Sequence, residues 1–347
     1  MRDAVTVTHA GEGDRAEWEA FAASRGEFYH RPGWGDVISS VYGHEPVCLI
    51  ARQGGEVTGI LPMIDRRSAL FGKALISMGF TVGGGVAATD QASKEALLEA
   101  AIAEAKNRGS DYVELRSEND NAEGWFEKTG IYDTFSTPLI EERDVRLKSI
   151  PRKKRADIRK GIGHGESGTL TIRVADDYDL FWQHYALAQR DHGTPVFPRR
   201  WLTEQKKIFG EAMELVFVEH DGEPLAGVVN YYHRQTVHLY SSFISPSARR
   251  FHAGDYLYWW MMGHGLERGA TEFDLGRAKQ GTGPHAYKTY WGIEPRPLGY
   301  LYKLMKTDEM PNVNPQNPKF ALMSKVWTRL PMPVANRLGP VLAGHLA

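Results

Sequence analysis

The residues best suited to chemistry are gathered in one stretch, residues 273–288, which mixes acidic, basic and glycine residues. The pattern predicts an apolar strand that runs into a loop carrying Gly281 and Gly283, followed by a short helix. Loops at strand ends hold ligand-binding groups while the sheet keeps them in place. Glycine lets the backbone approach a phosphate or carbonyl closely, and Arg277 and Lys279 supply positive charge. The stretch therefore predicts a ligand loop, with a plain surface turn as the alternative.

Two residues in this stretch are candidates for catalysis. Lys288, at the mouth of the predicted sheet, would stabilise the oxyanion of a tetrahedral intermediate in acyl transfer. Asp274 would orient that lysine or receive a proton from an attacking amine. A lysine that extends its ammonium into water is the alternative for Lys288, and a structural acid is the alternative for Asp274.

Positive charge is concentrated in two further places. Seven basic residues and one acid lie between Lys148 and Lys160, which predicts either a solvated helix face or a site for an anionic donor or acceptor. Residues 245–255, which include Arg250, precede a predicted helix. A helix N-terminus beside arginine and glycine can hold a pyrophosphate, so Arg250 is a candidate substrate-binding residue.

Residue types exclude several classes of site. Cys48 is the only cysteine and lies in an apolar run, so we expect a buried strand thiol, no internal disulfide and no cysteine-built metal site. The 13 histidines show no metal-binding spacing. The net charge of -1 argues against a protein that coats nucleic acid, and no DNA partner is expected. No tightly bound cofactor is expected either.

Length and composition indicate a globular protein with two ordinary domains. The chain has 347 residues, of which 42% are hydrophobic and 24% charged. The N-terminus is polar, and no segment approaches the roughly 20 apolar residues that span a bilayer. We therefore expect a cytoplasmic location, with the inner face of the membrane as a refinement of it.

An internal repeat begins with a predicted hairpin in each half of the chain. Residues 47–60 match residues 215–228 without gaps, and each segment reads as a strand, a polar turn and a second strand. In this match Gly54 corresponds to Gly222. Such hairpins are common, so this match alone is weak support for a repeat.

Two more matches occur further along the chain in the same order. Residues 107–115 match residues 267–275, and in both a predicted helix ends at a glycine suited to a left-handed C-cap. Residues 125–131 match residues 287–293, where we expect a short helix in each copy. Matches that recur in one order at similar offsets predict a tandem duplication.

The repeat makes the two copies comparable residue by residue. Lys288 corresponds to Phe126, which is expected to be a packing residue, so the second copy departs from packing at this position. Asp274 corresponds to Glu114, which is also acidic. A lysine in an apolar position costs stability unless it reaches water or an anion. The comparison therefore predicts that any chemistry lies in the second copy.

The order of the predicted elements defines a fold class. Each copy reads as a hairpin, a helix, a strand, a short helix and a strand, which is an α+β or mixed α/β arrangement of a mixed sheet flanked by helices. We expect an N-terminal domain over residues 1–146 and a C-terminal domain with the site over residues 147–310. A helical C-terminal tail is expected over residues 311–347, where apolar residues recur at helical spacing.

Several blocks of the sequence carry family resemblances. The aromatic-Glu-Lys-x-Gly pattern of residues 125–131 resembles a segment of GCN5-related N-acetyltransferase (GNAT) domains, and residues 245–255 loosely resemble their coenzyme A loop. Other blocks resemble the FemAB-related proteins, and in particular their subgroup associated with exosortase/PEP-CTERM and exopolysaccharide loci. These blocks are residues 28–34, 59–63, 68–73, 273–283, 287–292, 314–320 and 327–331.

This resemblance implies a pair of GNAT-like domains and an N-acyltransferase or aminoacyltransferase of envelope or exopolysaccharide biosynthesis. Tyr287-Lys288 match the phenylalanine-lysine motif of FemAB peptidyltransferases, whose lysine is implicated in catalysis. Trp34, from the first block, joins Tyr287 among the candidate substrate-binding residues. The implied donors are acyl-CoA as a cosubstrate, an acyl-carrier protein or an aminoacyl-tRNA. The implied acceptor is an amine on a small molecule, glycan or peptide.

A noncatalytic role is the rival interpretation. The chain would then be a binding or scaffold protein of an envelope-polysaccharide assembly system. The tail motivates this reading, because its helical spacing of apolar residues suits either packing on its own domain or a peripheral membrane contact.

Overall fold

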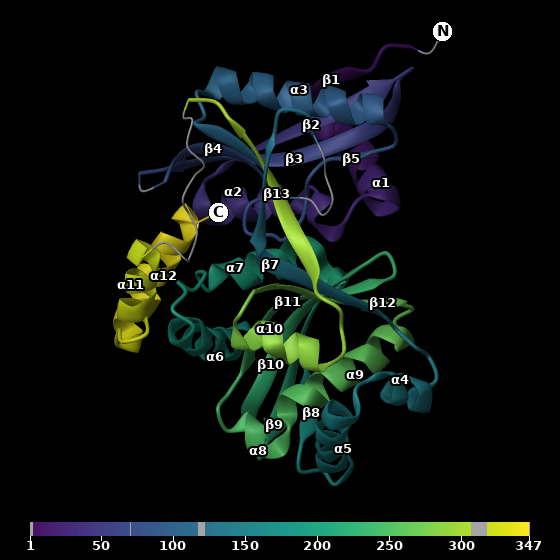
Figure 1. Ribbon diagram of the computed structural model, residues 1–347, viewed down its shortest axis with the longest axis vertical. Helices are drawn as coiled ribbons and strands as arrows, with labels where there is room; N and C mark the ends of the chain where they lie inside the picture. The colour runs from purple at the N-terminus through teal and green to yellow at the C-terminus, as the bar shows by residue number, and fades with distance from the viewer. Residues whose placement is uncertain (1–2, 70, 117–121, 307–317, 347) are drawn as a thin grey trace. The chain divides into compact units, whose positions relative to one another are not determined.

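The computed structural model describes residues 3–69, 71–116, 122–306 and 318–346. They form two compact units, which Figure 1 shows with their elements labelled. Unit 1 consists of residues 1–130, 193–208 and 298–347, and unit 2 of residues 131–192 and 209–297. The units do not follow the three consecutive segments expected from the sequence, because the chain passes between them more than once. The expected domain boundaries stay a prediction.

Unit 1 is built on a mixed sheet. Its strands follow the order β1-β2-β3-β4-β6-β13, with the short β5 on β3, and all neighbours are antiparallel except β4 and β6. The strands are β1 Thr6–His9, β2 Glu45–Gln53, β3 Glu56–Ser68, β4 Gly72–Ser77, β5 Ala87–Ala88, β6 Tyr112–Arg116 and β13 Arg296–Leu304. The helices are α1 Arg15–Arg25, α2 Gly33–Tyr42, α3 Gln91–Arg108, α7 Arg200–Phe209, α11 Pro318–Trp327 and α12 Met332–His345.

Both faces of the unit 1 sheet are covered by helices. Successive residues of a strand point to opposite faces, and the core follows this alternation. Leu49 and Leu61 pack in the cluster under α3, whereas Ile50 and Ile60 pack with Trp18 of α1. This is the burial pattern of a sheet between two helical layers.

Unit 2 has the same kind of sheet. Its order is β7-β12-β11-β10-β9-β8, and all neighbours are antiparallel except β11 and β12. The strands are β7 Phe126–Pro138, β8 Thr171–Val174, β9 Met213–His220, β10 Glu223–His233, β11 Thr236–Ile244 and β12 Glu272–Lys279. The helices are α4 Arg143–Ser149, α5 Arg152–Glu166, α6 Tyr178–Asp191, α8 Ala248–Phe251, α9 Ala253–Glu267 and α10 Gly283–Tyr290.

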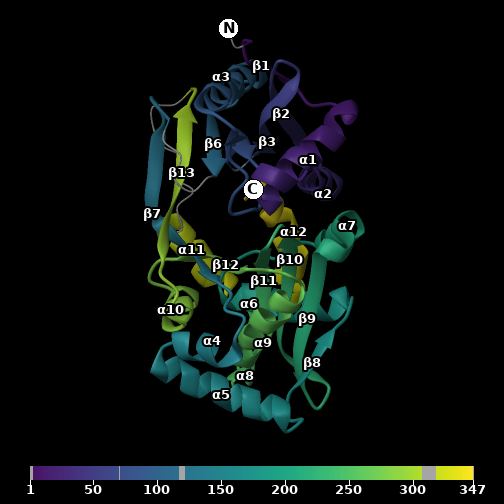
Figure 2. The same cartoon turned by 90° about the vertical axis from the view of Figure 1, so that its right-hand side faces the viewer.

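The unit 2 sheet is also covered on both faces. Val216 and Val218 lie in the core cluster that includes the buried residues of α9, whose packing against the sheet is visible in Figure 2. Phe217, between them in the sequence, contacts Phe181 of α6, with ring centroids 6.3 Å apart. Figures 1 and 2 together show α9 and α6 on either side of the strands.

The predicted duplication is confirmed by the order of elements. Apart from the short β5 and α8, unit 1 runs β2-β3-β4-α3-β6 and unit 2 runs β9-β10-β11-α9-β12, each with three antiparallel strands, a crossover helix and a parallel strand. The predicted mixed α/β fold with helices flanking each sheet is therefore also confirmed.

The turns of the two hairpins have the same backbone geometry, but their residues correspond with a shift of one position from the predicted alignment. Gly54 and Gly55 occupy the first turn with φ of +60° and +88°, and Asp221 and Gly222 occupy the second with φ of +50° and +80°. Gly54 therefore corresponds to Asp221 rather than to Gly222. The reason is that both hairpins fix their register through a two-residue turn with positive φ at both positions, which aspartate tolerates better than most residues.

The helix ends also agree, and here the predicted alignment is correct. Gly109 follows α3 with φ of +66°, and Gly269 follows α9 with φ of +80°. In each copy the next residue donates its N–H to a carbonyl five residues back, at 2.9 Å, as Ser110 does to Ala105. This satisfies carbonyls that a helix end otherwise leaves without donors.

In the third predicted match, the segment of the first copy does not form the expected helix. Residues 287–293 do begin in a helix, α10, but residues 126–138 form the strand β7. Threonine, isoleucine and aromatic residues are frequent in this stretch, and its latter part pairs with β12. Phe126 is 55% exposed, so the expectation that it is a packing residue is also wrong.

Candidate functional site

The parallel strands of unit 2 separate part-way along their length. β11 and β12 pair from Thr236 with Glu272 to His238 with Asp274, and the described residues beyond that point form no further pairs between these strands. The register of β12 against β7 shifts after Asp274. Gly276 has φ of +65°, and a Cβ there would lie 3.2 Å from the Leu239 carbonyl oxygen. The positive φ and this close approach explain why glycine stands where the strands part.

An aspartate–histidine pair lies where β11 and β12 separate. His238 Nδ1 lies 2.9 Å from Asp274 Oδ2, and the Gly276 N–H donates to Asp274 Oδ1 at 2.8 Å. Burial alone would raise the pKa of Asp274, but the bonds from His238 and Gly276 together with the charge of Lys288 hold that pKa below its usual value. Because a carboxylate only accepts, Nδ1 of His238 carries the proton and Nε2 carries the lone pair.

Lys288 of α10 is buried beside this pair rather than extended into water. Its Nζ donates to the carbonyl oxygens of Leu275 at 2.6 Å, Gly276 at 3.2 Å and Arg277 at 3.0 Å. The ammonium also lies over the ring of Phe135, 5.4 Å from its centroid. Burial lowers the pKa of Lys288 to about 8, against the opposing effect of Asp274.

These contacts give Lys288 a structural task that the sequence did not predict. An ammonium has three N–H donors, and here all three point at carbonyls of β12 where its register shifts. The lysine therefore holds the distorted strand in place. It could bind an oxyanion only by giving up one of these bonds, of which the one to Gly276 is the longest.

Tyr287, the neighbour of Lys288, is tied to the beginning of α9. Its hydroxyl donates to Asp255 Oδ1 at 2.6 Å, and the ammonium of Lys154 lies 4.1 Å from the centre of its ring. Lys154 is buried and forms an ion pair with Asp255. Burial, followed by the negative charge of Asp255, raises the pKa of Tyr287 well above its ordinary value. A tyrosine, an aspartate and a lysine thus connect α10, α9 and α5.

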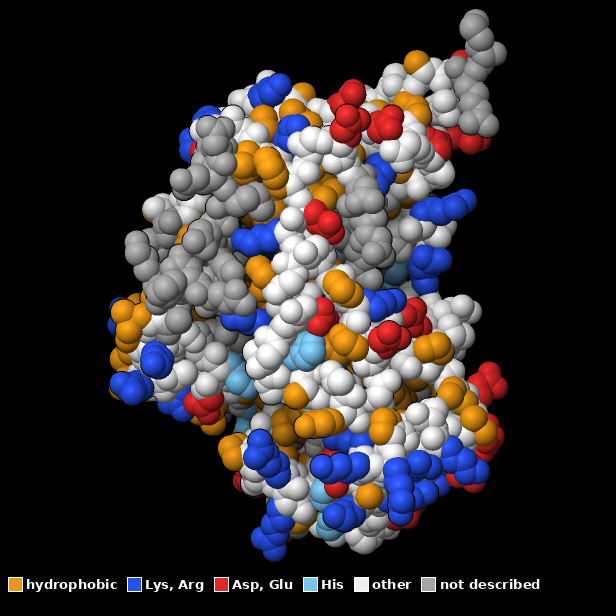
Figure 3. All heavy atoms as spheres, viewed as in Figure 1, with side chains coloured by type: hydrophobic (Ala, Val, Ile, Leu, Met, Phe, Trp, Pro, Cys, Tyr) orange, Lys and Arg blue, Asp and Glu red, His pale blue; other side chains and the backbone are white. Residues whose placement is uncertain are grey.

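The predicted anion-binding segment before α9 contains the short helix α8 and a single residue, His252, between the two helices. His252 immediately precedes α9 with φ of +54°, a conformation in which glycine is more usual. Arg250 lies in the short helix α8 and is exposed, with its guanidinium 5.4 Å from the ring of Phe251. The predicted basic helix is α5, and it contacts α8 and α9. Figure 3 shows its Lys and Arg side chains gathered on the lower surface of unit 2.

The predicted ligand loop lies between β12 and α10. Arg277 and Lys279 belong to β12 and are partly exposed, and the guanidinium of Arg277 lies 4.7 Å from the centroid of Tyr132. Gly281 and Gly283 are both exposed, and Gly281 has φ of +75°. The structure thus brings the loop residues, Tyr287 and Lys288 onto one strand–loop–helix segment.

Two predicted residues lie elsewhere, in unit 1. Trp34 belongs to α2 and is fully buried, with ring centroids 5.8 Å from Phe28 and 6.3 Å from Trp201. Trp34 therefore belongs to the core of unit 1, whereas Lys288 belongs to unit 2. Cys48 lies on strand β2 as expected, and burial raises the pKa of its thiol to about 12, which suits an inert thiol.

A second aspartate–histidine pair in unit 2 was missed by sequence reasoning. His285 Nε2, on α10, lies 2.7 Å from Asp133 Oδ2, on β7, and Gln280 donates to the other oxygen of Asp133 at 2.9 Å. The rings of His285 and Phe135 meet edge to face, with centroids 5.3 Å apart. Asp133 and His285 are 152 residues apart in sequence, and no local pattern announces such a pair.

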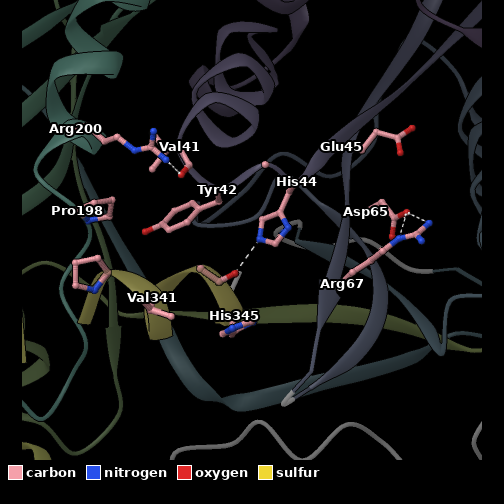
Figure 4. A pocket seen from close by; sticks show the side chains of 13 residues that line it. Val41, Tyr42, His44, Glu45, Asp65, Arg67, Pro198, Arg200, Val341 and His345 are labelled. Carbon is pink, nitrogen blue, oxygen red and sulfur yellow. Dashed lines mark hydrogen bonds and ion pairs between the residues drawn. The ribbon is translucent and has the colours of Figure 1, made fainter. Parts of the chain in front are cut away.

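A pocket of about 570 Å³ lies within unit 1, and Figure 4 shows its lining. His44 donates its Nε2–H to the Gly344 carbonyl at 2.8 Å, and burial lowers the pKa of His44, which favours the neutral ring. The buried Asp65 forms ion pairs with Arg67 at 2.9 Å and Arg108 at 3.2 Å. Among the described residues that line this pocket, none was predicted from the sequence.

Comparison with known proteins finds a domain match that covers the elements of this site. Residues 152–289 match the family model of an acetyltransferase (GNAT) domain, and this segment includes β11, α9, β12 and Lys288. No curated protein matches the chain. The predicted acyltransferase domain is thereby confirmed, and it lies in the copy to which sequence comparison assigned the chemistry.

Solved structures show the same fold over nearly the whole chain. A crystal structure of FemX has a TM-score of 0.70 at 16% identity, covering 92% of this chain and 100% of that one. L-PGS from Bacillus licheniformis has a TM-score of 0.57 at 13% identity, covering 91% and 97%. A tandem GNAT protein from the clavulanic acid biosynthesis pathway has a TM-score of 0.52 at 10% identity, covering 88% and 100%. At these identities the likeness shows the fold.

None of the helices within residues 3–69, 71–116, 122–306 and 318–346 is both long enough and apolar enough to cross a bilayer.

Proposed function

We propose that the chain is an N-acyltransferase or aminoacyltransferase and that unit 2 carries the reaction. The observation that carries this proposal is the separation of β11 and β12, with His238 and Asp274 at its base. Separated strands offer backbone N–H and C=O groups with which an amide-containing donor can pair. The match of residues 152–289 to an acetyltransferase (GNAT) domain supports the same unit.

The proposed reaction is direct attack of an amine on a thioester or ester. A new C–N bond forms, the carbonyl oxygen becomes an oxyanion, and the bond from carbon to the donor's sulfur or oxygen then breaks. The attacking nitrogen must lose one proton, and the leaving group takes up one. His238 Nε2 is suited to carry that proton, because Asp274 fixes the ring through Nδ1.

Lys288 and Asp274 enter this proposal chiefly as positioning residues. Lys288 holds the carbonyls of β12 where the strand bends, and its positive charge would stabilise an oxyanion that forms nearby. Asp274 orients His238 and stabilises the imidazolium that forms. The oxyanion role predicted for Lys288 stays a proposal that requires the bond to Gly276 to be exchanged.

The proposed donor is anionic. Arg249 and Arg250 are exposed on α8, directly before α9, and helix N-termini favour negative charge. Arg277 and Lys279 would bind a second anionic group, beside the exposed loop that carries Gly281 and Gly283. Acyl-CoA, acyl-carrier protein and aminoacyl-tRNA all carry phosphate groups as well as an activated carbonyl, so the three are the donors to be compared. Trp34 would act only by shaping unit 1, since it is buried.

The proposed acceptor is an amine on an envelope or exopolysaccharide precursor, and we place the chain in the exosortase/PEP-CTERM-associated FemAB-related subgroup. The sequence blocks 273–283 and 287–292 support this placement. The fold shared with FemX and L-PGS agrees with it.

His285 is the second candidate base, since Asp133 orients it in the same manner. Its Nε2 is bonded to the carboxylate, which leaves Nδ1 to accept a proton. Replacing each histidine by asparagine separates the two assignments. We expect His238→Asn to remove amide formation and His285→Asn to retain most of it. The reverse result would assign the base to His285.

The direct test is a donor panel read by mass spectrometry of the amide product. Acyl-CoAs, acyl-carrier-protein thioesters and aminoacyl-tRNA are each incubated with amino-sugar and peptide amines. We expect one donor class to give product with the wild type. His9→Asn is the matched control, because His9 also pairs with a carboxylate, that of Glu104 at 3.1 Å in unit 1, and it should keep full activity.

The same donor panel also tests the noncatalytic alternative. If no donor yields product and none raises the melting temperature of the protein, the scaffold interpretation replaces the enzyme. Ligands that co-purify with the wild type and are lost from a Lys288 variant would identify the donor directly.

A further inference from the structure

The C-terminal helices of unit 1 expose several large apolar side chains, although Trp327 of α11 is buried and Leu342 of α12 is half-buried. In α12, Val334, Leu338 and Val341 are exposed, at the spacing of one helix face. In α11, Leu322 and Val326 are exposed at the same spacing. Leu322 is 64% exposed and Val341 is 63% exposed. Isolated exposed apolar residues are ordinary, but two helices that each expose a row of them need an explanation.

The inner face of α12 shows that these side chains are not needed for packing on unit 1. Its buried residues are Ala335, Gly339, Ala343 and Gly344. A Cβ at Gly339 would lie 3.0 Å from the backbone nitrogen of Val196, and one at Gly344 would lie 2.7 Å from the ring of Tyr42. The helix thus docks mainly through small residues at very close approach, while Val334, Leu338 and Val341, the last at the rim of the unit 1 pocket, remain exposed. This is the reverse of an ordinary surface helix, whose large apolar residues face the core.

The charge of this segment has a single sign. Residues 318–347 contain no aspartate or glutamate, and their lysines and arginines are Lys319, Lys325, Arg329 and Arg337. The last three are exposed. Figure 3 shows hydrophobic side chains beside Lys and Arg at the left edge of the molecule, where α11 and α12 lie in Figure 1. The whole chain has a net charge of -1, so this local excess is not a general property of the protein.

We propose that α11 and α12 form a surface that docks the chain on an anionic lipid bilayer. Exposed aliphatic side chains flanked by lysine and arginine, without acids, are the pattern of helices that lie in the membrane interface. The aliphatic side chains enter the acyl region, and the cations reach the phosphates of the headgroups. With 14 residues in α12, about 21 Å of helix, the segment lies on the surface and does not cross the bilayer.

This proposal is independent of acyl transfer and is tested without an activity assay. The protein is sedimented with vesicles of phosphatidylcholine alone and of phosphatidylcholine mixed with phosphatidylglycerol, at low and high salt. We expect binding to the mixed vesicles, weakened by salt, and little binding to phosphatidylcholine alone.

Two variants separate the apolar and the charged contributions. Leu338→Glu combined with Val341→Glu should weaken binding by at least about tenfold, since it removes aliphatic burial and adds negative charge. Arg329→Gln combined with Arg337→Gln should weaken binding and remove most of its salt dependence. All four positions are exposed, so the fold should persist, and circular dichroism checks this.

The matched control carries the same chemistry on another surface. Val174 and Tyr290, in unit 2, are 49% and 65% exposed, and Val174→Glu with Tyr290→Glu should bind vesicles like the wild type. Wild type that stays in the supernatant with mixed vesicles at low salt would overturn the proposal, as would equal binding by the Leu338/Val341 variant. Light scattering that finds a wild-type dimer and a monomeric Leu338/Val341 variant would instead assign the surface to a second copy of the chain.

Discussion

The two units place different residues at the same point of one fold. In unit 1 the parallel strands β4 and β6 bring Ile76 beside Glu114. Arg116, two residues along the same strand, donates its Nε to Glu114 at 2.8 Å, and both side chains are buried. In unit 2 the corresponding strands bring His238 beside Asp274. One carboxylate is held by a permanent cation, and the other by an imidazole ring.

The two copies thus share a backbone arrangement while their polar contacts have diverged. A buried arginine–glutamate pair fixes geometry and cannot transfer protons in the physiological range. A histidine–aspartate pair in the same place can. The comparison therefore predicts a structural role for the pair in unit 1 and a role in turnover for the pair in unit 2.

The largest expected effect comes from making unit 2 resemble unit 1. His238→Ile copies Ile76 into the second unit and should lower turnover about 100- to 10,000-fold, the range typical of general bases. The reciprocal change, Ile76→His, should leave turnover unchanged. Initial rates of amide formation at saturating donor measure both. Equal turnover in wild type and His238→Ile would show that the pair in unit 2 has no role in turnover.

The next effect concerns the ion pair of unit 1. Arg116→Met leaves Glu114 buried without its cation and should lower the free energy of unfolding by about 3–5 kcal/mol. Glu114→Leu combined with Arg116→Met removes both charges and should recover most of that loss. Urea unfolding followed by circular dichroism measures each variant. A single variant as stable as the wild type would mean that the pair does not hold unit 1 together.

Lys288→Met tests the clamp on β12 in unit 2. The variant leaves three carbonyl oxygens without their donor and should lower the free energy of unfolding by about 2–3 kcal/mol, together with turnover. Phe126→Met, at the aligned but exposed position in unit 1, should change stability by less than about 0.5 kcal/mol. A Lys288→Met protein that is inactive but as stable as the wild type would favour the oxyanion role over the clamp.

The pH dependence of the free energy of unfolding is a further test of the role of Lys288. Burial lowers the pKa of Lys288 to about 8 from the ordinary 10.5, so between these values the unfolded chain binds more protons than the folded one. The contribution of Lys288 to stability should therefore rise with pH in this window, by about 1 kcal/mol per pH unit, and be flat below pH 8. Turnover should move the opposite way as the ammonium is lost. Lys288→Met should abolish this slope in urea titrations at pH 8, 9 and 10.

Much of the fold could be predicted from sequence because its determinants are local. Polar turns with glycine mark the hairpins, and Gly109 and Gly269 mark the helix ends, so two of the three repeat matches locate equivalent elements. The alignment of the first hairpin is off by one residue because it matched Gly54 to Gly222 by residue type, whereas the two-residue turns pair Gly54 with Asp221. β7 was assigned to a helix because its match to α10 compared residue types and not backbone periodicity.

The candidate site was only partly predictable, because its contacts depend on register and tertiary packing. Lys288 was singled out through its match to Phe126, which the structure does not support because it aligns α10 with β7. Its three acceptors are backbone carbonyls that no sequence pattern exposes. His238 meets Asp274 through the register of a parallel pair, 36 residues apart. Asp133 and His285 lie still further apart in sequence.

The smallest expected effect tests whether the two copies are equivalent where they look alike. Gly109→Ala and Gly269→Ala each force an alanine into a left-handed C-cap and should lower stability by about 1 kcal/mol. A Cβ at Gly269 meets nothing within 4 Å, and one at Gly109 meets only the Lys306 ammonium at 3.2 Å, the movable end of a long side chain. Urea unfolding should therefore give nearly equal losses. A much larger loss at Gly109 would show that the bond from Lys306 to its carbonyl, at 2.6 Å, makes the cap of unit 1 a different structure from that of unit 2.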